Sequence, residues 1–278
     1  VRVLGAVSYL RRLYAALDKA GFGGEIMIDL GLVHEMDYYT GIMFRGYVGG
    51  AGTVIVSGGR YNALCAKFGR DLPAGGFGVD VENLAQLKGE TETKQRNSVR
   101  IALTKGRLEK KTLSFLKSAG YDTSELETGS RKLIFTLPNT NIEIVLAKAA
   151  DVITYVEHGV CDMGVVGKDT IMEKGGSFYE MVDLGFGKCR FALATKKGKQ
   201  AYGGSVELTP LLELADAIVD IVETGSTLKE NGLEVIEDVA PISARVIVNL
   251  ASAKMKKNDI KQIIDALENG RKAESEGK

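Results

Sequence analysis

The chain has 278 residues, which is longer than one average domain, so we expect one large domain or two with a substantial core. Its 36 basic and 36 acidic side chains give a formal net charge of zero, which excludes a general field that attracts nucleic acid or an anionic membrane. No apolar run reaches the roughly 20 residues of a membrane helix, and three cysteines without C-x-x-C spacing argue for reduced thiols and against structural zinc. We therefore expect a soluble cytoplasmic protein that binds neither nucleic acid nor membrane.

The first 87 residues mix helix and strand signals. Apolar residues at helical spacing predict a helix from Val3 to Leu17, which glycines at 21, 23 and 24 end. Further elements are expected as strands at Glu25–Leu32, Tyr38–Tyr47 and Thr53–Ser57, a short helix at Tyr61–Phe68, and a last strand and helix ending near Leu87. This pattern predicts an α+β domain over residues 1–87, built on an antiparallel meander.

Residues 88–98 hold no apolar side chain and mix both charge signs, which is typical of a solvated linker. Strand and helix signals alternate after it, which predicts an α/β domain over residues 99–278. Strands are expected at Val99–Leu103, Leu133–Leu137, Ile142–Leu146, Met163–Val166, Ala217–Val222 and Arg245–Asn249, and helices at Leu108–Ala119, Ala150–His158 and Ile260–Leu267. Two buried strands of this domain end in polar loops, which is where open α/β sheets bind ligands.

The loop after the strand Ala217–Val222 has the composition of a phosphate site. Its residues are Thr224, Gly225, Ser226 and Thr227. Glycine lets the backbone approach a ligand, and successive N–H groups and hydroxyls donate to phosphate oxygens. The carboxylates of Asp220 and Glu223, just before the loop, could accept hydrogen bonds from ribose hydroxyls. An ordinary strand-to-helix turn with a Ser or Thr cap has the same composition and remains an alternative.

Two further turns at strand ends carry a cation beside glycine. They consist of Lys105, Gly106 and Arg107, and of Gly167, Lys168 and Asp169. Guanidinium groups bind phosphate oxygens in a bidentate manner, so the turn with Lys105 and Arg107 suits a polyphosphate, and the turn with Lys168 could hold another anion. Arg131 and Lys132 precede another strand and either converge on the same edge or form a solvated surface pair.

Other common chemistries find little support. The lysine spacing of a P-loop is absent, which argues against that class of ATPase. The chain has only two histidines, His34 and His158, and neither lies in a nucleophile elbow or a metal-binding cluster. His158 could act as a general base, but a histidine in the last helical turn more often complements the helix dipole.

Five segments together resemble the ATP phosphoribosyltransferase family, in the order in which that family has them. They are TKGRL at 104–108, SRKL at 130–133, DVITYVEHG at 151–159, DMGVVGKD at 162–169 and DAIVDIVETGSTLKENGL at 216–233. The resemblance covers Val99–Leu267 and implies a bilobal α/β fold similar to type II periplasmic binding proteins. We expect no separate regulatory domain at the C-terminus, so the chain resembles the short form, which requires a partner similar to histidyl-tRNA synthetase.

The resemblance implies transfer of phosphoribosyl from 5-phosphoribosyl 1-diphosphate (PRPP) to N1 of ATP, with release of pyrophosphate, as the first step of histidine biosynthesis. Substrate-bound Mg²⁺ is expected, and no covalent nucleophile is needed. The roles implied are stabilisation of the leaving group by Arg107, Arg131 and Lys105, PRPP binding by Asp220, Glu223, Thr224, Gly225, Ser226 and Thr227, and ATP binding by Gly106, Gly167, Lys168 and Asp169.

Residues 1–87 resemble the C-terminal part of the catalytic domain of histidyl-tRNA synthetases. The resemblance rests on HEMDYYTG at 34–41, SGGRYNAL at 57–64 and GGFGVDVENL at 75–84. Those synthetases have arginines at the positions of His34 and Asn83, so the resemblance implies a regulatory domain without aminoacylation chemistry. Tyr38 and Tyr39 are expected to bind L-histidine as an inhibitor, although packing on a half-exposed strand would explain them equally. A homo-oligomer or hetero-oligomer with synthetase-like regulatory subunits is expected.

The chain departs from both family patterns. The resemblance starts partway through the synthetase-like domain, so we expect its front half to be missing, and GKQAYG at 198–203 stands where the transferases have a strand, a helix and a strand. A shortened second lobe predicts exposed apolar surface there and puts activity in question. Two other function classes therefore stay open, an inactive fusion that senses histidine or binds nucleotide, and a solute-binding protein, which the cation at Lys105 disfavours.

Overall fold

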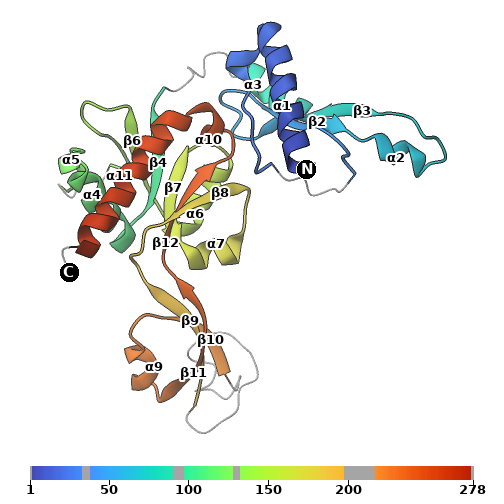
Figure 1. Ribbon diagram of the computed structural model, residues 1–278. Coiled ribbons are helices and arrows are strands. Elements are labelled where there is room, and N and C mark those ends of the chain that lie inside the picture. The colour runs from blue at the N-terminus through green and yellow to red at the C-terminus, as the bar shows by residue number, and fades with distance from the viewer. Residues whose placement is uncertain (1, 33–37, 90–96, 128–131, 197–216, 277–278) are drawn as a thin grey trace. The chain divides into compact units, whose positions relative to one another are not determined.

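The computed structural model describes residues 2–32, 38–89, 97–127, 132–196 and 217–276 (Figure 1). The chain divides into two compact units, one of Val1–Phe44 with Ser57–Gly78 and one of Arg45–Val56 with Val79–Lys278. Most of the predicted linker, residues 90–96, lies outside the described residues. The domain boundary at 88–98 therefore stays a prediction.

The N-terminal elements form a helix and a small sheet. Their bounds are α1 (Arg2–Lys19), the 3₁₀ helix η1 (Gly23–Glu25), β1 (Met43–Tyr47), β2 (Val54–Arg60), α2 (Asn62–Ala66), β3 (Gly75–Val79) and α3 (Val81–Gly89), with the sheet in the order β1-β2-β3. The strand predicted at Glu25–Leu32 is wrong, because its first residue ends η1 and the rest pairs with no strand of the described chain. Ile28 and Leu30 are instead exposed beside α1.

A six-stranded sheet forms the centre of the second unit. Its strands are β4 (Val99–Thr104), β5 (Ile134–Thr136), β6 (Ile142–Ala147), β7 (Met163–Gly167), β8 (Phe178–Asp183) and β12 (Ala244–Asn249), in the order β5-β6-β4-β7-β12-β8. The central strand β4 runs parallel to β6 and β7, while β12 returns antiparallel between β7 and β8. The carboxyl ends of β4, β6 and β7 therefore share one edge.

Helices cover both faces of this sheet (Figure 1). On one face α4 (Arg107–Ser118) and α11 (Lys257–Glu276) bury residues such as Phe115 and Ile263, and on the other α6 (Ala149–Glu157) and α7 (Lys168–Lys174) bury Val152 and Ile171. Two short helices, α5 (Ser124–Glu127) and α10 (Ser252–Met255), complete this lobe. Such two-sided burial explains the nearly continuous apolar sequence of β7.

A second, smaller lobe extends from the large sheet. It contains β9 (Cys189–Lys196), β10 (Ala217–Val222), α9 (Ser226–Glu230) and β11 (Leu233–Ile242), with β9 antiparallel to and between the other two strands. Ile218, Leu228 and Leu233 form a buried core on one face. On β10 the side chains of Val219 and Ile221 remain 45% and 44% exposed. This exposure agrees with the apolar surface predicted for a shortened lobe.

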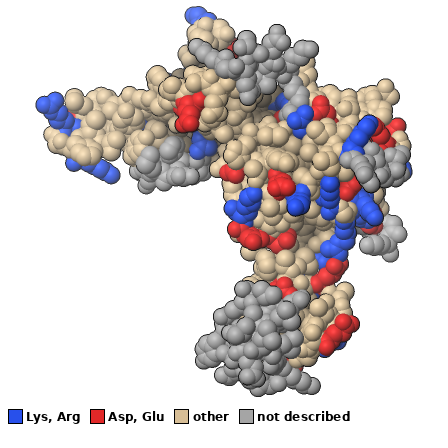
Figure 2. All heavy atoms as spheres, turned by 180° about the vertical axis from the view of Figure 1, so that it is seen from behind, with Lys and Arg blue, Asp and Glu red and all other residues tan. Residues whose placement is uncertain are grey.

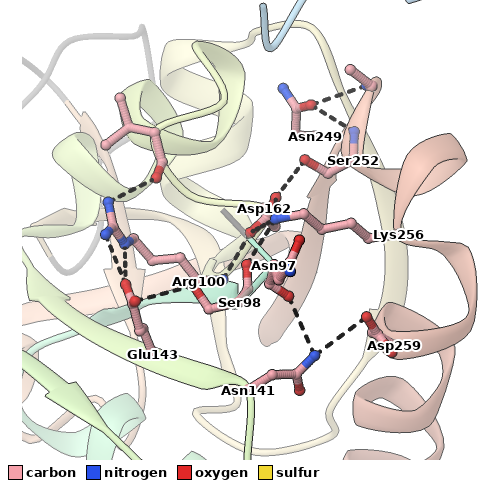
Figure 3. Close-up of polar contacts among 12 residues, drawn as sticks. Asn97, Ser98, Arg100, Asn141, Glu143, Asp162, Asn249, Ser252, Lys256 and Asp259 are labelled. Atoms are coloured by element: carbon pink, nitrogen blue, oxygen red, sulfur yellow. Dashed lines mark hydrogen bonds and ion pairs between the residues drawn. The ribbon is translucent and has the colours of Figure 1, made fainter. Parts of the chain in front are cut away.

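A buried polar network fastens the C-terminal helices to the amino ends of the strands (Figure 3). The carboxylate of Asp162, which is 2% exposed, accepts the N–H of Arg100 at 2.8 Å and the hydroxyl of Ser252 at 2.7 Å. The Lys256 ammonium lies 3.0 Å from the same carboxylate and donates to the Ser98 carbonyl at 2.7 Å. Because this edge is opposite the predicted cationic turns, the network is structural.

The surface shows no dominant charge on the face drawn in Figure 2, where Lys and Arg side chains alternate with Asp and Glu. This distribution matches the zero net charge. Within the part of the chain that the structure describes, no helix combines the length and apolar character needed to cross a membrane.

Candidate functional site

The two predicted cationic turns lie side by side at the carboxyl edge of the large sheet. The Thr104 hydroxyl donates to the Val165 carbonyl at 3.0 Å, which fixes the end of β4 against the end of β7. Lys105 follows, with its backbone N–H bonded to the Ala147 carbonyl of β6. Gly106 and Arg107 then begin α4, and Lys105 and Arg107 are both exposed to solvent. The parallel strands thus deliver these residues to the same edge as Gly167 and Lys168.

An ion pair joins this edge to the smaller lobe. Nη1 of Arg107 donates to Oε1 of Glu223, which follows β10. The two side chains are 58% and 54% exposed. The ion pair therefore brings the Arg107 turn, expected to stabilise the leaving group, next to the Glu223 loop, expected to bind PRPP.

The loop after Glu223 is compact and rich in donors. Gly225 has a φ of 77°, a left-handed conformation that glycine adopts without strain, and it precedes the first residue of α9. The hydroxyls of Thr224 and Ser226 lie 3.0 Å apart, and Thr227 is exposed. Asp220 lies on β10 opposite Ala192, and its Oδ1 accepts the N–H of Ile221 at 2.7 Å. Hydroxyl groups thus gather at the end of β10 that carries Glu223, and those of Thr224 and Ser226 bond to one another.

The second turn, Gly167–Asp169, is tied to the chain that crosses between the lobes. The Lys168 N–H donates to the Ser243 carbonyl at 3.0 Å, and its ammonium lies 2.6 Å from Oε2 of Glu180 on β8. Arg245 contacts the other oxygen of Glu180 at 3.5 Å and a carboxylate oxygen of Asp183 at 3.1 Å. Lys168 is therefore part of a chain of alternating charges beside the crossing strands.

Asp183 ends β8, where the chain leaves the large sheet. Its Oδ1 accepts hydrogen bonds from the Ser243 hydroxyl at 2.7 Å and the Gly185 N–H at 2.8 Å. Burial opposes ionisation of this carboxyl, but these two bonds and the nearby charges of Arg245 and Arg271 outweigh it and lower the pKa of Asp183. The ionised side chain thereby fastens the outgoing and returning strands to one another.

Cys189, the first residue of β9, is a neighbour of the site that the sequence did not indicate. Burial raises the pKa of its thiol, the Asp169 and Glu223 carboxylates raise that pKa further, and Arg107 lowers it. The pKa of this thiol therefore depends on the charges of both turns and of the Glu223 loop. A lone cysteine outside any recognised motif gave no signal of this position.

Arg131, predicted to stabilise the leaving group, lies outside the described residues. Lys132 is described and pairs with Glu125 at 2.5 Å on an exposed surface, which fits the alternative of a solvated pair. The structure therefore brings Lys105, Arg107 and Glu223 to one junction and leaves the place of Arg131 open.

The predicted histidine-binding tyrosines form a cluster with a third tyrosine. Tyr38 donates to the Tyr39 hydroxyl at 3.1 Å, and the Tyr61 ring stands edge-on to both, at centroid distances of 5.5 and 6.2 Å. The hydrogen bond with Tyr38 and burial raise the pKa of Tyr39. Gly59 allows this packing, because a Cβ there would lie 2.7 Å from the Tyr39 ring and 2.6 Å from the Ile42 carbonyl oxygen. His34 lies outside the described residues, and Asn83 instead donates to Asp80 at the start of α3.

The described residues contain no group of three histidine, cysteine or carboxylate side chains that could hold a metal by itself. The Glu223 carboxylate nevertheless stands at the junction beside Arg107, and the Asp169 carboxylate lies near enough to Cys189 to raise the pKa of its thiol. Mg²⁺ commonly uses one or two carboxylates together with substrate phosphates and water. These residues therefore fit a metal that arrives with its phosphate ligand.

Two lobes joined by adjacent crossing strands, with cationic turns on one and a hydroxyl-rich loop on the other, define a bilobal α/β protein. The ATP phosphoribosyltransferase family model matches residues 148–202 and 200–269, and the histidyl-tRNA synthetase model matches residues 2–84. The transferase of Clostridium kluyveri is 50% identical over 202 residues, covering 61% of this chain and 92% of that protein. The transferase of Listeria monocytogenes is 48% identical over 208 residues, covering 64% and 98%.

A solved structure gives the same result. The ATP phosphoribosyl transferase (HisG:HisZ) complex from Thermotoga maritima contains a chain with a TM-score of 0.53 and 28% identity, covering 63% of this chain and 99% of that one. The present chain therefore belongs to the ATP phosphoribosyltransferase family, whose reaction is the first step of histidine biosynthesis. Its N-terminal segment is histidyl-tRNA synthetase-like.

The match to the C. kluyveri transferase also indicates how many residues the shortened second lobe lacks. Because 61% of 278 residues is about 170, roughly 30 of the 202 aligned positions of the C. kluyveri relative have no counterpart in this chain. The family model likewise matches in two pieces that meet near residue 200. The gap therefore falls where GKQAYG replaces a longer segment, in residues 198–203 that the structure does not describe.

Proposed function

We propose that PRPP and ATP react at the junction between the two lobes. N1 of ATP attacks the anomeric carbon of the ribose, the bond from that carbon to the diphosphate breaks, and its electron pair leaves with pyrophosphate. The single observation that carries the placement is the ion pair between Arg107 and Glu223, because it brings a cationic turn and a hydroxyl-rich loop together. Positioning and electrostatic stabilisation then supply most of the catalysis.

The PRPP site would use both lobes. Arg107 and Lys105 would face the diphosphate, where negative charge grows in the transition state, together with Arg131. Backbone N–H groups and hydroxyls of residues 224–227 would hold the 5-phosphate. Asp220 and Glu223 would accept hydrogen bonds from the ribose hydroxyls. The charges in this arrangement complement the ligand, with cations at the leaving group and carboxylates at the sugar.

ATP would bind at the carboxyl edge of the large sheet, beside PRPP. Gly106 lets its phosphates approach the start of α4, and Lys168 supplies a second cation from the adjacent turn with Gly167 and Asp169. Two cations at neighbouring strand ends suit a triphosphate. Lys168 is held 2.6 Å from Glu180, so it lies at that edge before any ligand arrives.

Mg²⁺ would be held mainly by the phosphate oxygens of the substrates and water, with a carboxylate such as Glu223 or Asp220 as an additional ligand. When bound, the ion neutralises phosphate charge. The residues of this chain orient the two substrates around it.

The N-terminal segment would act as a regulatory element for L-histidine. The cluster of Tyr38, Tyr39 and Tyr61 offers aromatic faces and hydroxyls that could line an imidazole site. The related Thermotoga maritima assembly contains HisG with HisZ, and we propose that this chain likewise assembles with synthetase-like subunits. Such subunits would also cover apolar side chains that this segment exposes, including Phe68 at 82% and Phe77 at 70%.

The function is tested by incubating the full chain with PRPP, ATP and Mg²⁺ and following the ultraviolet absorbance of the phosphoribosylated adenine. A signal that depends on both substrates supports the proposal, and its suppression by L-histidine supports the regulatory role. The shortened second lobe favours a second candidate, a fusion that binds ligands without turnover. That candidate predicts histidine or nucleotide binding by calorimetry with no absorbance change, also when a synthetase-like subunit is added.

A further inference from the structure

The ion pair between Arg107 and Glu223 occupies the guanidinium group that the proposed function assigns to the diphosphate. Arg107 begins α4 on the large sheet, and Glu223 follows β10 in the smaller lobe. A carboxylate of the chain itself therefore binds where a substrate anion is expected. We infer that Glu223 makes this site prefer a sugar-linked diphosphate over bare pyrophosphate, because it competes for Arg107 whenever no ribose is bound. The inference rests on the proposed role of Arg107.

The competition follows from the chemistry of the groups. Carboxylate and phosphate oxygens accept hydrogen bonds from the same guanidinium N–H groups, so one must leave before the other binds in the same geometry. Both side chains are more than half exposed, so a ligand reaches the pair from solvent without unfolding any element. A bound diphosphate displaces Glu223 but leaves its negative charge beside the diphosphate.

A ribose attached to the diphosphate changes the interaction with the displaced Glu223 from repulsion to attraction. The hydroxyls of a sugar-linked diphosphate offer hydrogen-bond donors to the displaced carboxylate, which then stabilises the complex. Bare pyrophosphate offers no such donor, so the displaced Glu223 only repels it. Glu223 thus favours the substrate while disfavouring the product that has lost its sugar, and it promotes release of pyrophosphate after the reaction.

The size of the effect follows from the exposure of the pair. Exposed ion pairs contribute at most about 1 kcal/mol, or about fivefold in an equilibrium constant. Removing the carboxylate charge should therefore tighten pyrophosphate binding by about two- to fivefold. The same change should weaken PRPP binding, because an amide accepts hydrogen bonds from hydroxyls less strongly than a carboxylate does. A gain in affinity for pyrophosphate together with a loss in affinity for PRPP distinguishes competition from general damage to the site, which would weaken the binding of both.

The experiment compares wild-type chain, Glu223→Gln and Glu274→Gln by calorimetry with sodium pyrophosphate in metal-free buffer, and measures KM for PRPP in the standard assay. Glu274 on α11 is the matched control. It pairs with Lys111, which lies on α4 one turn beyond Arg107. Glu223→Gln should bind pyrophosphate two- to fivefold more tightly with a raised KM for PRPP. Glu274→Gln should change neither value.

A double-mutant cycle with Arg107→Ala completes the test. Glu223→Gln should tighten pyrophosphate binding more when Arg107 is present than in the Arg107→Ala background. Unchanged or weaker pyrophosphate binding in the single variant overturns the inference, and so does an equal gain in the Arg107→Ala background, which would indicate simple charge removal. If Arg107→Ala alone binds pyrophosphate as tightly as wild type, the proposed role of Arg107 fails, and the inference fails with it.

Discussion

Replacing Arg107 by Ala removes one fixed donor from the proposed leaving-group site. Loss of one preorganised donor typically lowers kcat by about 10²- to 10³-fold. The Arg107 side chain is 58% exposed, so solvent screens part of its field and the lower value, about 10²-fold, is expected here. The lost pair with Glu223 is also exposed and contributes at most about 1 kcal/mol to folding, which leaves the fold intact.

The assay is turnover at saturating ATP and PRPP with Mg²⁺, followed by absorbance of the product. Lys110→Ala is the matched control, because Lys110 is an exposed cation on the same helix to which no substrate contact is assigned. That variant should retain its kcat, and both variants should unfold within about 4 °C of the wild-type temperature. An unchanged kcat in Arg107→Ala would remove this residue from leaving-group stabilisation, and an equal loss in Lys110→Ala would indicate a general effect of charge.

Thr227→Val should raise KM for PRPP with little change in KM for ATP, because it deletes one hydroxyl of the proposed phosphate loop; equal shifts in both constants would contradict the assignment. Gly59→Ala should weaken inhibition by histidine, since its Cβ would meet the tyrosine cluster, whereas Gly78→Ala has open space and should not. Asp162→Asn should lower the free energy of unfolding in urea by about 3 kcal/mol, as expected for breaking a buried ion pair. The depressed pKa of Asp183 stabilises the fold above its unfolded pKa of about 3.9 and loses that effect as pH falls through the lower native value, so Asp183→Asn should flatten the acid limb of a stability profile.

Most of the large lobe could be predicted from sequence, because its elements have strong local signals. The amphipathic α4 and the apolar β4, β6 and β7 appear within two residues of their predicted bounds. Strands β8 and β9 were not predicted, since FYEMVD and CRFALATK mix polar and apolar residues without a clear period. Their positions depend on pairing with β12 and β11, which follow much later in the chain.

The segment Glu25–Leu32 shows the opposite case, a local strand signal without a strand in the structure. Its residues have strand-like composition, and Ile26 has extended dihedral angles, but no described strand lies beside the segment to accept its hydrogen bonds. Composition records a preference for extended backbone, whereas a strand also requires a neighbour. Whether a described strand lies beside this segment depends on the folded chain, and local sequence does not contain that information.

The candidate site was predictable as a set of loops but not as a set of contacts. Glycine, hydroxyl and cation patterns located the three turns that the structure brings to one junction. The pairing of Arg107 with Glu223 spans 116 residues, and no local pattern specifies such a contact. Cys189 and Tyr61 were likewise missed as members of their sites, because neither stands out from its neighbours in sequence.

The position of β12 has a consequence for how this chain is made. It lies between β7 and β8, yet it is synthesised after the whole smaller lobe. Until residue 249 has emerged from the ribosome, β8 has no partner in the large sheet, and one side of β7 remains uncovered. Completion of the large sheet therefore depends on contacts distant in sequence, which fold slowly and leave strand edges exposed. The whole smaller lobe must therefore be synthesised before β12 can complete the large sheet.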